Sequence, residues 1–174
     1  MDFGELLAQV RDAFEYDLQH RGITLDIHQP MPRLHVERNR MRQVFQNLID
    51  NAIKYMSERE DARIEIDYAL LDGMHRFRVS DNGPGIAPDD QDRIFYVFRR
   101  AATTRAAKVP GKGIGLALVR SVAANYDGRA WVESAPGAGA AFYVELNTPS
   151  TEGPPGGQEP GTPESVGAAA AAKP

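Results

Sequence analysis

The sequence predicts an α/β fold built around a mixed β-sheet. Segments with helical periodicity alternate with segments whose apolar residues recur at every second position, which is typical of helices packed on a sheet. The clearest helix, Arg38 to Ser57, carries an unbroken apolar stripe. The clearest strands, Arg63 to Leu71 and Met74 to Asp81, flank Asp72-Gly73, a hairpin turn signal. These two strands should be antiparallel, which argues against an all-parallel sheet.

Length and composition indicate one domain followed by a tail. The 174 residues carry a formal net charge of -4, which provides no bulk attraction to nucleic acid or to an anionic membrane. The absence of cysteine excludes disulfides and cysteine-ligated metal sites, and it fits a reducing compartment. No apolar run approaches membrane-spanning length. We therefore expect a cytoplasmic domain without nucleic-acid or direct membrane contact, whose parent protein could still be membrane-anchored.

The first elements are a helix and a strand. Asp2 to Arg21 has apolar residues at helical spacing, with Glu5 placed to complete an N-terminal cap and Gly22 to end the helix. Ile23 to Ile27 alternates apolar and polar residues and is expected to be a strand. After two prolines, Leu34 to Val36 has the composition of a short strand.

The polar face of the helix at Arg38 to Ser57 carries a line of amides and one ammonium group. Gln43, Asn47, Asn51 and Lys54 follow one another at helical spacing. A solvated helix face is one interpretation, but asparagine is a poor helix former and has no evident reason to recur there. Amide oxygens can bind Mg²⁺, and a lysine one turn away can contact a phosphate. We favour a phosphate and magnesium site.

A carboxylate is expected to point into the core at the end of the second hairpin strand. Phe77, Val79 and Asp81 alternate and share one face, and two of the three are apolar. A buried carboxylate needs a donor, and no basic residue follows it. The turn Asn82 to Gly85 leaves room for a flat group, so a purine amine would satisfy the acid. The alternative is a strand that ends in an ordinary Asn-Gly turn.

Two further segments precede the last helix. Pro88 to Phe98 opens like a helix, with proline and acids in its first turn. Arg99 to Lys108 has four basic residues and no apolar period, and we interpret it as a mobile lid, with a plain surface loop as the alternative. Gly111 to Leu116 then feeds a helix that ends near Gly128, an arrangement that favours phosphate binding. It lacks the preceding strand of a dinucleotide fold and the ending of a P-loop.

Two strands and a tail complete the chain. Ala130 to Ser134 and Ala140 to Leu146 have strand patterns and are separated by a Pro-Gly turn. After them the composition collapses to Pro, Gly, Glu, Thr and Ala. We expect a domain at residues 1–147 and a disordered tail at residues 148–174.

Taken in order, these segments resemble the catalytic ATP-binding domain of sensor histidine kinases, in the gyrase and histidine-kinase ATPase superfamily. Asn47 to Tyr55 resembles the N box of that family, and Asp81 to Ile86 resembles its first glycine box. Ile94 to Phe98 is similar to the F box, and Gly111 to Leu116 to the second glycine box. Pro136 to Phe142 is similar to the terminal hairpin of the family. Four boxes in the correct order form a much more specific signal than any one of them.

The resemblance implies a two-layer α/β sandwich with a mixed, largely antiparallel sheet and helices on one face. It also implies ATP and Mg²⁺ as ligands, with Asn51 as the metal ligand and Asn47, Asn51 and Lys54 as the residues nearest the chemistry. Asp81 would accept a hydrogen bond from the adenine amine. The nucleotide-binding residues implied by the matched boxes are Asn47, Asn51, Lys54, Tyr55, Asp81, Gly83, Gly85, Ile86, Arg100, Gly111, Lys112, Gly113, Ile114, Gly115 and Leu116.

By the same resemblance, the chain is expected to present the ATP γ-phosphate to a histidine on a separate domain or chain. Its own histidines do not sit in the phosphoacceptor context of the family. The implied partners are a histidine-bearing dimerisation domain and a response regulator of a two-component system. Two alternatives stay open at this point: a serine/threonine kinase of the anti-sigma-factor type, and a non-catalytic nucleotide-sensing module.

Overall fold

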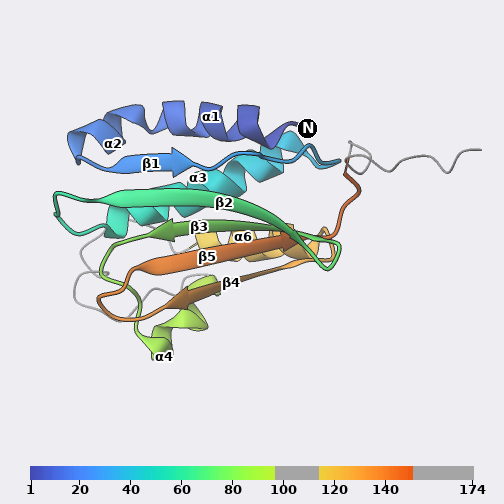
Figure 1. Ribbon diagram of the computed structural model, residues 1–174. Coiled ribbons are helices and arrows are strands. Elements are labelled where there is room, and N and C mark those ends of the chain that lie inside the picture. The colour runs from blue at the N-terminus through green and yellow to red at the C-terminus, as the bar shows by residue number, and fades with distance from the viewer. Residues whose placement is uncertain (97–113, 151–174) are drawn as a thin grey trace, which may run out of the picture.

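The structure is a computed structural model, which describes residues 1–96 and 114–150 (Figure 1). The expectations for the lid, for Phe98 and for residues 151–174 of the tail lie outside the described residues. The described part has a five-stranded sheet, with the helices Arg38–Tyr55 (α3) and Gly115–Ala124 (α6) behind it in the view of Figure 1.

The sheet is mixed and largely antiparallel, as the resemblance implied. Its strand order is β1-β2-β3-β5-β4. β1 runs parallel to β2, whereas the other three neighbouring pairs are antiparallel. The strand bounds are Thr24–Ile27 for β1, Arg63–Leu71 for β2, Met74–Asp81 for β3, Arg129–Ser134 for β4 and Ala140–Leu146 for β5. β3 is therefore the middle strand, between β2 and β5.

The hairpin predicted at Asp72-Gly73 is confirmed between β2 and β3. Asp72 has φ 52° and Gly73 has φ 78°, so both turn residues adopt the left-handed conformations that match the twist of paired strands. The resulting register places Val79 opposite Ile66 and Asp81 opposite Ile64. This register fixes which residues of β3 face the core.

The helices pack on one face of the sheet. Their bounds are Phe3–Ala13 for α1, Glu15–His20 for α2, Arg38–Tyr55 for α3, Pro88–Gln91 for α4, Arg93–Phe95 for the 3₁₀ turn η1 and Gly115–Ala124 for α6. Phe3 of α1 stacks on Phe77 of β3 with ring centroids 4.4 Å apart, and Phe45 of α3 meets Phe77 edge-on at 5.5 Å. These three fully buried rings join both helices to the middle strand, as expected for a two-layer sandwich.

The opposite face of the sheet is polar and internally paired. The Glu145 carboxylate accepts hydrogen bonds from Arg76 and Arg129, on the strands at either side of β5. Trp131 and Tyr143 stack with their centroids 4.8 Å apart, and Arg129 lies over the Trp131 ring. Cross-strand pairs of this kind stabilise a sheet whose second face meets water.

Three sequence expectations need correction. The helix expected over Asp2 to Arg21 is interrupted at Phe14, where α1 ends and α2 begins. The expected strand at Leu34 to Val36 is not formed: within it only Leu34 makes an isolated bridge, to Ser150, and a second bridge joins Asp2 to the preceding residue, Arg33. The helix expected from Pro88 splits into α4 and η1.

Residues 148–150 bond to the segment around His35. The Thr148 hydroxyl donates to the carbonyl of His35 at 2.9 Å, and the His35 amide donates to the carbonyl of Pro149 at 3.2 Å. Ser150 pairs with Leu34. The chain thus remains bonded to the domain as far as Ser150, three residues past the boundary that we propose.

Candidate functional site

The predicted site residues that the structure describes come from three places in the fold. Asn47, Asn51, Lys54 and Tyr55 lie on α3, Asp81 ends β3, and Gly115 begins α6. α3 packs against both α6 and β3. The predicted residues at Arg100, Gly111, Lys112 and Gly113 lie outside the described residues.

The Asp81 side chain lies on the core face of β3, as the alternation predicted. Phe77 and Val79 on the same face are each 1% exposed. Asp81 accepts a hydrogen bond from the Gly83 amide at 2.8 Å, and the backbone of Ala140 also hydrogen bonds to the carboxyl. Burial raises the pKa of Asp81, and these two backbone bonds oppose that shift. No basic side chain in the described ranges forms an ion pair with it, so the carboxylate retains acceptor capacity for a ligand.

The glycine turn after Asp81 is held by the hairpin that joins β4 to β5. Ile86 donates its amide to the Ser134 hydroxyl at 2.8 Å, and that hydroxyl donates to the Gly139 carbonyl at 2.6 Å. Gln91 donates through its Nε2 atom to the carbonyls of Ile86 and Ser134, at 3.0 and 2.8 Å. A Cβ on Gly85 would lie 2.0 Å from the Ala135 carbonyl oxygen, and Gly85 has φ 74°. Only glycine fits this contact, because the turn and hairpin touch backbone to backbone.

Asn47 lies against the start of α6. Its Nδ2 donates to the Gln43 carbonyl at 2.8 Å, one turn back along α3. This bond fixes the amide so that Oδ1 faces Gly115, where a Cβ would lie only 2.6 Å from it. An amide oxygen is thereby presented at the N-terminus of a helix, where unpaired backbone amides attract anions.

Asn51 and Lys54 occupy the next turns of α3. Both are partly buried, and the Asn51 amide has no hydrogen-bond partner among the described residues. An amide oxygen on this helix face is a donor of the kind that Mg²⁺ accepts beside phosphate oxygens, so the residues fit that ion. The Lys54 ammonium lies 2.5 Å from Asp50 Oδ2, an i, i+4 ion pair that the sequence analysis did not identify. To contact a phosphate, the Lys54 ammonium must either leave Asp50 or bind the carboxylate and the phosphate together.

The remaining predicted residues line the edges of this region. Tyr55 is partly buried at the end of α3. Ile86 and Leu116 are partly buried against the core, whereas Ile114 is 41% exposed. α6 has no side-chain cap at its N-terminus, which leaves its first amides to other partners.

Several residues that shape the site carry no sequence signal. Ser134 and Gln91 act on the glycine turn, yet Ser134 lies far along the chain from Ile86 and neither belongs to a motif. Asn82 was identified only as a turn residue, but its side chain joins the turn to β2. By contrast, the Asp50 and Lys54 pair could have been found from helical spacing alone.

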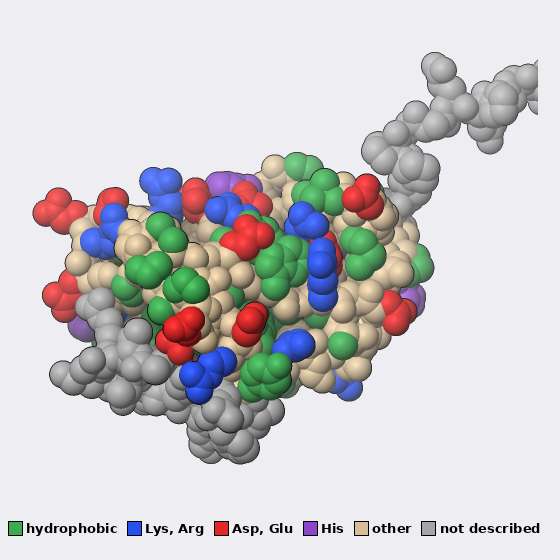
Figure 2. All heavy atoms as spheres, turned by 90° about the horizontal axis from the view of Figure 1, so that it is seen from below, with side chains coloured by type: hydrophobic (Ala, Val, Ile, Leu, Met, Phe, Trp, Pro, Cys, Tyr) green, Lys and Arg blue, Asp and Glu red, His purple; other side chains and the backbone are tan. Residues whose placement is uncertain are grey.

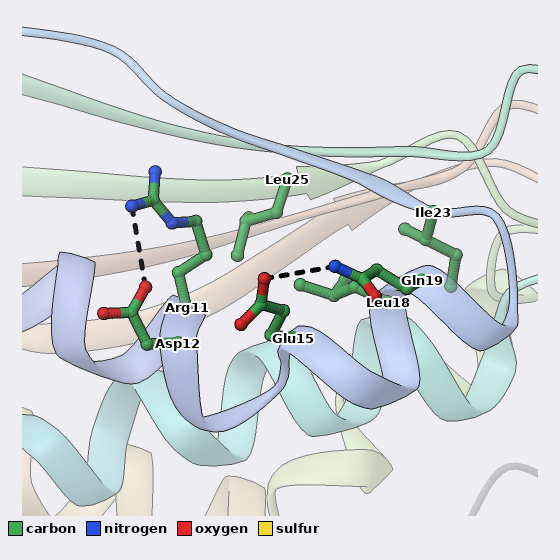
Figure 3. A pocket seen from close by; sticks show the side chains of 7 residues that line it. All are labelled: Arg11, Asp12, Glu15, Leu18, Gln19, Ile23 and Leu25. Atoms are coloured by element: carbon green, nitrogen blue, oxygen red, sulfur yellow. Dashed lines mark hydrogen bonds and ion pairs between the residues drawn. The ribbon is translucent and has the colours of Figure 1, made fainter.

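A separate hollow of roughly 280 Å³ lies at the other edge of the sheet, between α1, α2 and β1 (Figure 3). Its inner wall is formed by Leu18, Ile23 and Leu25. Polar groups on its rim pair with one another: Gln19 donates to Glu15 at 3.1 Å, and Arg11 lies near Asp12. Because its polar groups are already paired and it lies away from Asp81, we do not assign it to the nucleotide site.

The face seen in Figure 2 carries acidic and basic side chains beside one another, with hydrophobic ones between them, where grey atoms do not cover it. This mixture agrees with the small net charge of -4. No helix in the described ranges is both long and apolar enough to cross a bilayer.

Comparison with known families identifies residues 36–150 as a match to the histidine kinase-, DNA gyrase B-, and HSP90-like ATPase family. Among curated proteins, the chain is 34% identical over 147 residues to the methanogenesis regulatory histidine kinase FilI of Methanothrix harundinacea (strain 6Ac). That match covers 84% of this chain but 16% of FilI. The chain thus spans only a small part of this relative.

Two solved structures share the fold. Full-length ShkA in complex with AMPPNP superposes with a TM-score of 0.74 at 31% identity, covering 88% of this chain and 31% of ShkA. The nucleotide-free catalytic domain of the histidine kinase ThkA superposes with a TM-score of 0.69 at 26% identity, covering 84% of this chain and 94% of that domain. The similarity to ThkA thus extends over nearly the whole of an isolated catalytic domain.

Proposed function

Because the chain belongs to the histidine kinase-, DNA gyrase B-, and HSP90-like ATPase family, we propose that it binds ATP with Mg²⁺ and presents the γ-phosphate to a histidine on a separate domain or chain. Its reaction would be that of a histidine protein kinase in a two-component system. A histidine-bearing dimerisation domain and a response regulator are its proposed partners. The similarity to the histidine kinases FilI and ThkA, and to ShkA solved with AMPPNP, supports this assignment.

The single observation that carries the proposal is the Asp81 carboxylate. It is turned toward the core, it is bonded only by backbone amides among the described residues, and a glycine turn lies beside it. An exocyclic amine can donate to its free acceptor positions, whereas a carbonyl at the same place would be repelled. This chemistry selects adenine over guanine, which carries an oxygen at that position.

The phosphates are assigned to α3 and to the segment that leads into α6. Asn47 and Asn51 offer amide oxygens, and Lys54 offers a positive charge. A bound Mg²⁺ would neutralise charge that develops on the transferred phosphoryl group. Asn51 is the proposed metal ligand, while Arg100, Gly111, Lys112 and Gly113 are proposed phosphate contacts by family resemblance.

Phosphoryl transfer places few other demands on this chain. The acceptor imidazole supplies the nucleophile, and its nitrogen forms a bond to phosphorus as the bond to the ADP oxygen breaks. Such reactions depend mainly on positioning and charge stabilisation. The chain therefore needs no general base of its own.

Calorimetric titration with ATP and Mg²⁺ tests nucleotide binding. Wild type should bind, and Asp81→Asn should lose most of the affinity. Asp72→Asn is the matched control, because it makes the same chemical change at an exposed turn at the other end of β3. Failure of wild type to bind would refute the proposal.

A transfer assay separates the proposed kinase from its alternatives. The chain is incubated with γ-labelled ATP and an isolated histidine-bearing dimerisation domain of a sensor kinase, and the product is treated with acid. Acid-labile label on the added domain supports histidine transfer. Acid-stable label on a protein acceptor would indicate a serine/threonine kinase, and binding without transfer to any acceptor would indicate a nucleotide-sensing module.

A further inference from the structure

We propose that Arg59, anchored by Asp61, is a positioning residue that holds the Asp81 carboxylate in the orientation needed to recognise an amine. The inference rests on the proposed function of Asp81 as the adenine acceptor. Arg59 lies in the loop between α3 and β2, outside every motif. Its role follows from one peptide group that it shares with Asp81.

The shared group is the peptide that joins Asn82 to Gly83. Arg59 donates through its Nη1 atom to the carbonyl of Asn82, on one side of this peptide. On the other side, the Gly83 amide donates to Asp81 Oδ1 at 2.8 Å. The carbonyl and amide of a trans peptide point in opposite directions, so a bond to one fixes the direction of the other. Arg59 thus directs the Gly83 amide at the carboxylate.

This peptide would otherwise have unusual freedom. Gly83 has no side chain to restrict its backbone, so the preceding peptide can rotate at low cost. A reversed peptide would point the Asn82 carbonyl at Asp81 and repel the carboxylate. A positive charge on the carbonyl also polarises the peptide and strengthens the bond from its amide. Arg59 therefore opposes the one local rearrangement that would misdirect the acid.

Arg59 is itself fixed by a bidentate contact. Its Nε and Nη2 atoms donate to the two carboxylate oxygens of Asp61, at 2.6 and 2.9 Å. The hydrogen bond from Arg59 lowers the pKa of Asp61, so the pair stays charged over a wide range of pH. A planar fork of this kind fixes the guanidinium in direction, which a single contact does not.

Asn82 reinforces the same arrangement from its side chain. Its Nδ2 donates to the Asp61 carbonyl at 2.7 Å, and its Oδ1 accepts from the Arg63 amide at 2.9 Å. The turn after β3 is thereby joined to the start of β2 at several points. The Arg63 side chain does not touch this peptide; it lies near Asp26 and Glu65 instead. Arg63 is therefore a matched control for the loss of an arginine at this edge.

The test compares ATP with purine riboside triphosphate, which lacks the exocyclic amine. Dissociation constants for both nucleotides with Mg²⁺ give the preference of each variant for the amine. Arg59→Ala is expected to reduce this preference about three- to tenfold, the effect of about one hydrogen bond. The preference of Arg59→Lys should lie between those of wild type and Arg59→Ala, since an ammonium can reach the Asn82 carbonyl but cannot form the bidentate contact with Asp61. Arg63→Ala should leave the preference unchanged.

A second readout does not depend on nucleotide. The hydrogen-exchange rate of the Gly83 amide, measured by NMR, should be higher in Arg59→Ala than in wild type. It should be unaltered in Arg63→Ala. Equal loss of affinity for both nucleotides, or an unchanged preference with unchanged Gly83 exchange, would overturn the inference. If wild type shows no preference for the amine, the adenine assignment of Asp81 fails, and Gly83 exchange alone decides the role of Arg59.

Discussion

The two ends of β3 each place a titratable side chain on the core face, but they use it differently. His75 at the hairpin end is 4% exposed. Its Nδ1 lies 2.8 Å from the Tyr68 hydroxyl, and its ring also bonds to the backbone of Thr148. Among the described residues, Asp81 at the other end is bonded only by the backbone groups of Gly83 and Ala140. His75 thus has its hydrogen-bond partners within the domain, whereas the Asp81 carboxylate keeps free acceptor positions in the part of the chain that the structure describes.

Burial acts in opposite directions on the two pKa values but disfavours charge in both groups. It lowers the pKa of His75 and raises the pKa of Asp81. At neutral pH the His75 imidazole is uncharged and avoids the cost of burying a charge, whereas an ionised Asp81 carboxylate does not avoid it. The difference teaches that burial alone does not mark a binding site. The informative observation is a partly buried carboxylate that lacks a full set of partners among the described residues.

Asp81→Asn is the strongest test of this contrast. The substitution should weaken ATP binding by about 1.5–3 kcal/mol, since it removes the ionised acceptor of a charge-assisted bond. The melting temperature at pH 7 should not fall, because an amide oxygen can still accept from Gly83 and a partly buried charge is lost. Calorimetry and thermal unfolding measure the two effects. A melting temperature that drops by several degrees would show that Asp81 is structural.

His75→Ala should give the reverse result. It leaves the Tyr68 hydroxyl without its imidazole partner in the interior, at a cost of about 1–3 kcal/mol of unfolding free energy. ATP affinity should remain that of wild type, because the residue lies at the far end of β3. Denaturant unfolding and calorimetry provide the measurements. Weakened binding in a folded variant would contradict the division between the two ends.

The pH dependence of stability should also separate the two residues. The pKa of His75 is lower in the folded state than its ordinary value of 6.5, so its contribution is present above pH 6.5 and is lost as the pH falls below it. The pKa of Asp81 is raised above 3.8, so its contribution is present below pH 3.8 and is lost as the pH rises through the raised pKa.

Unfolding free energies of wild type minus each variant, measured across this range, should therefore slope in opposite directions. ATP affinity should rise with pH as Asp81 ionises, and it should lose this dependence in Asp81→Asn. If the two differences changed with pH in the same direction, the environments of His75 and Asp81 would not differ as described.

Tyr68→Phe sharpens the comparison with the smallest change. It removes one hydroxyl from the His75 end and should cost about 0.5–1.5 kcal/mol of unfolding free energy. Nucleotide affinity should not change. Double-mutant analysis with His75→Ala should show that the two losses are not additive, because the residues share one bond. Additive losses would mean that the bond contributes little.

Local patterns predicted much of the fold. The stripe on α3 and the alternation around Asp72-Gly73 were confirmed, because each depends on residues close together in the chain. The break at Phe14 and the parallel pairing of β1 with β2 were not predicted. Both depend on which distant element each segment packs against, and neither leaves a periodic signal.

The candidate site was predictable to a similar extent. Alternation along β3 correctly placed Asp81 on the core face. The supporting contacts of Ser134, Gln91 and Arg59 were missed, because they join ordinary polar residues from separate elements to one turn. Sequence motifs identify the groups expected to touch a ligand more readily than those that hold them in place.

The segment around Leu34 contacts residues near both ends of the described chain. Asp2 pairs with Arg33, and Ser150 pairs with Leu34, so residues distant in sequence emerge at one corner (Figure 1). In a circular permutant, a short linker would join Ser150 to Asp2, and the new chain ends would lie in the β2–β3 hairpin. This permutant should keep the same strand order. The proposed nucleotide site around Asp81, at the opposite end of β3, would be left intact by such a rearrangement.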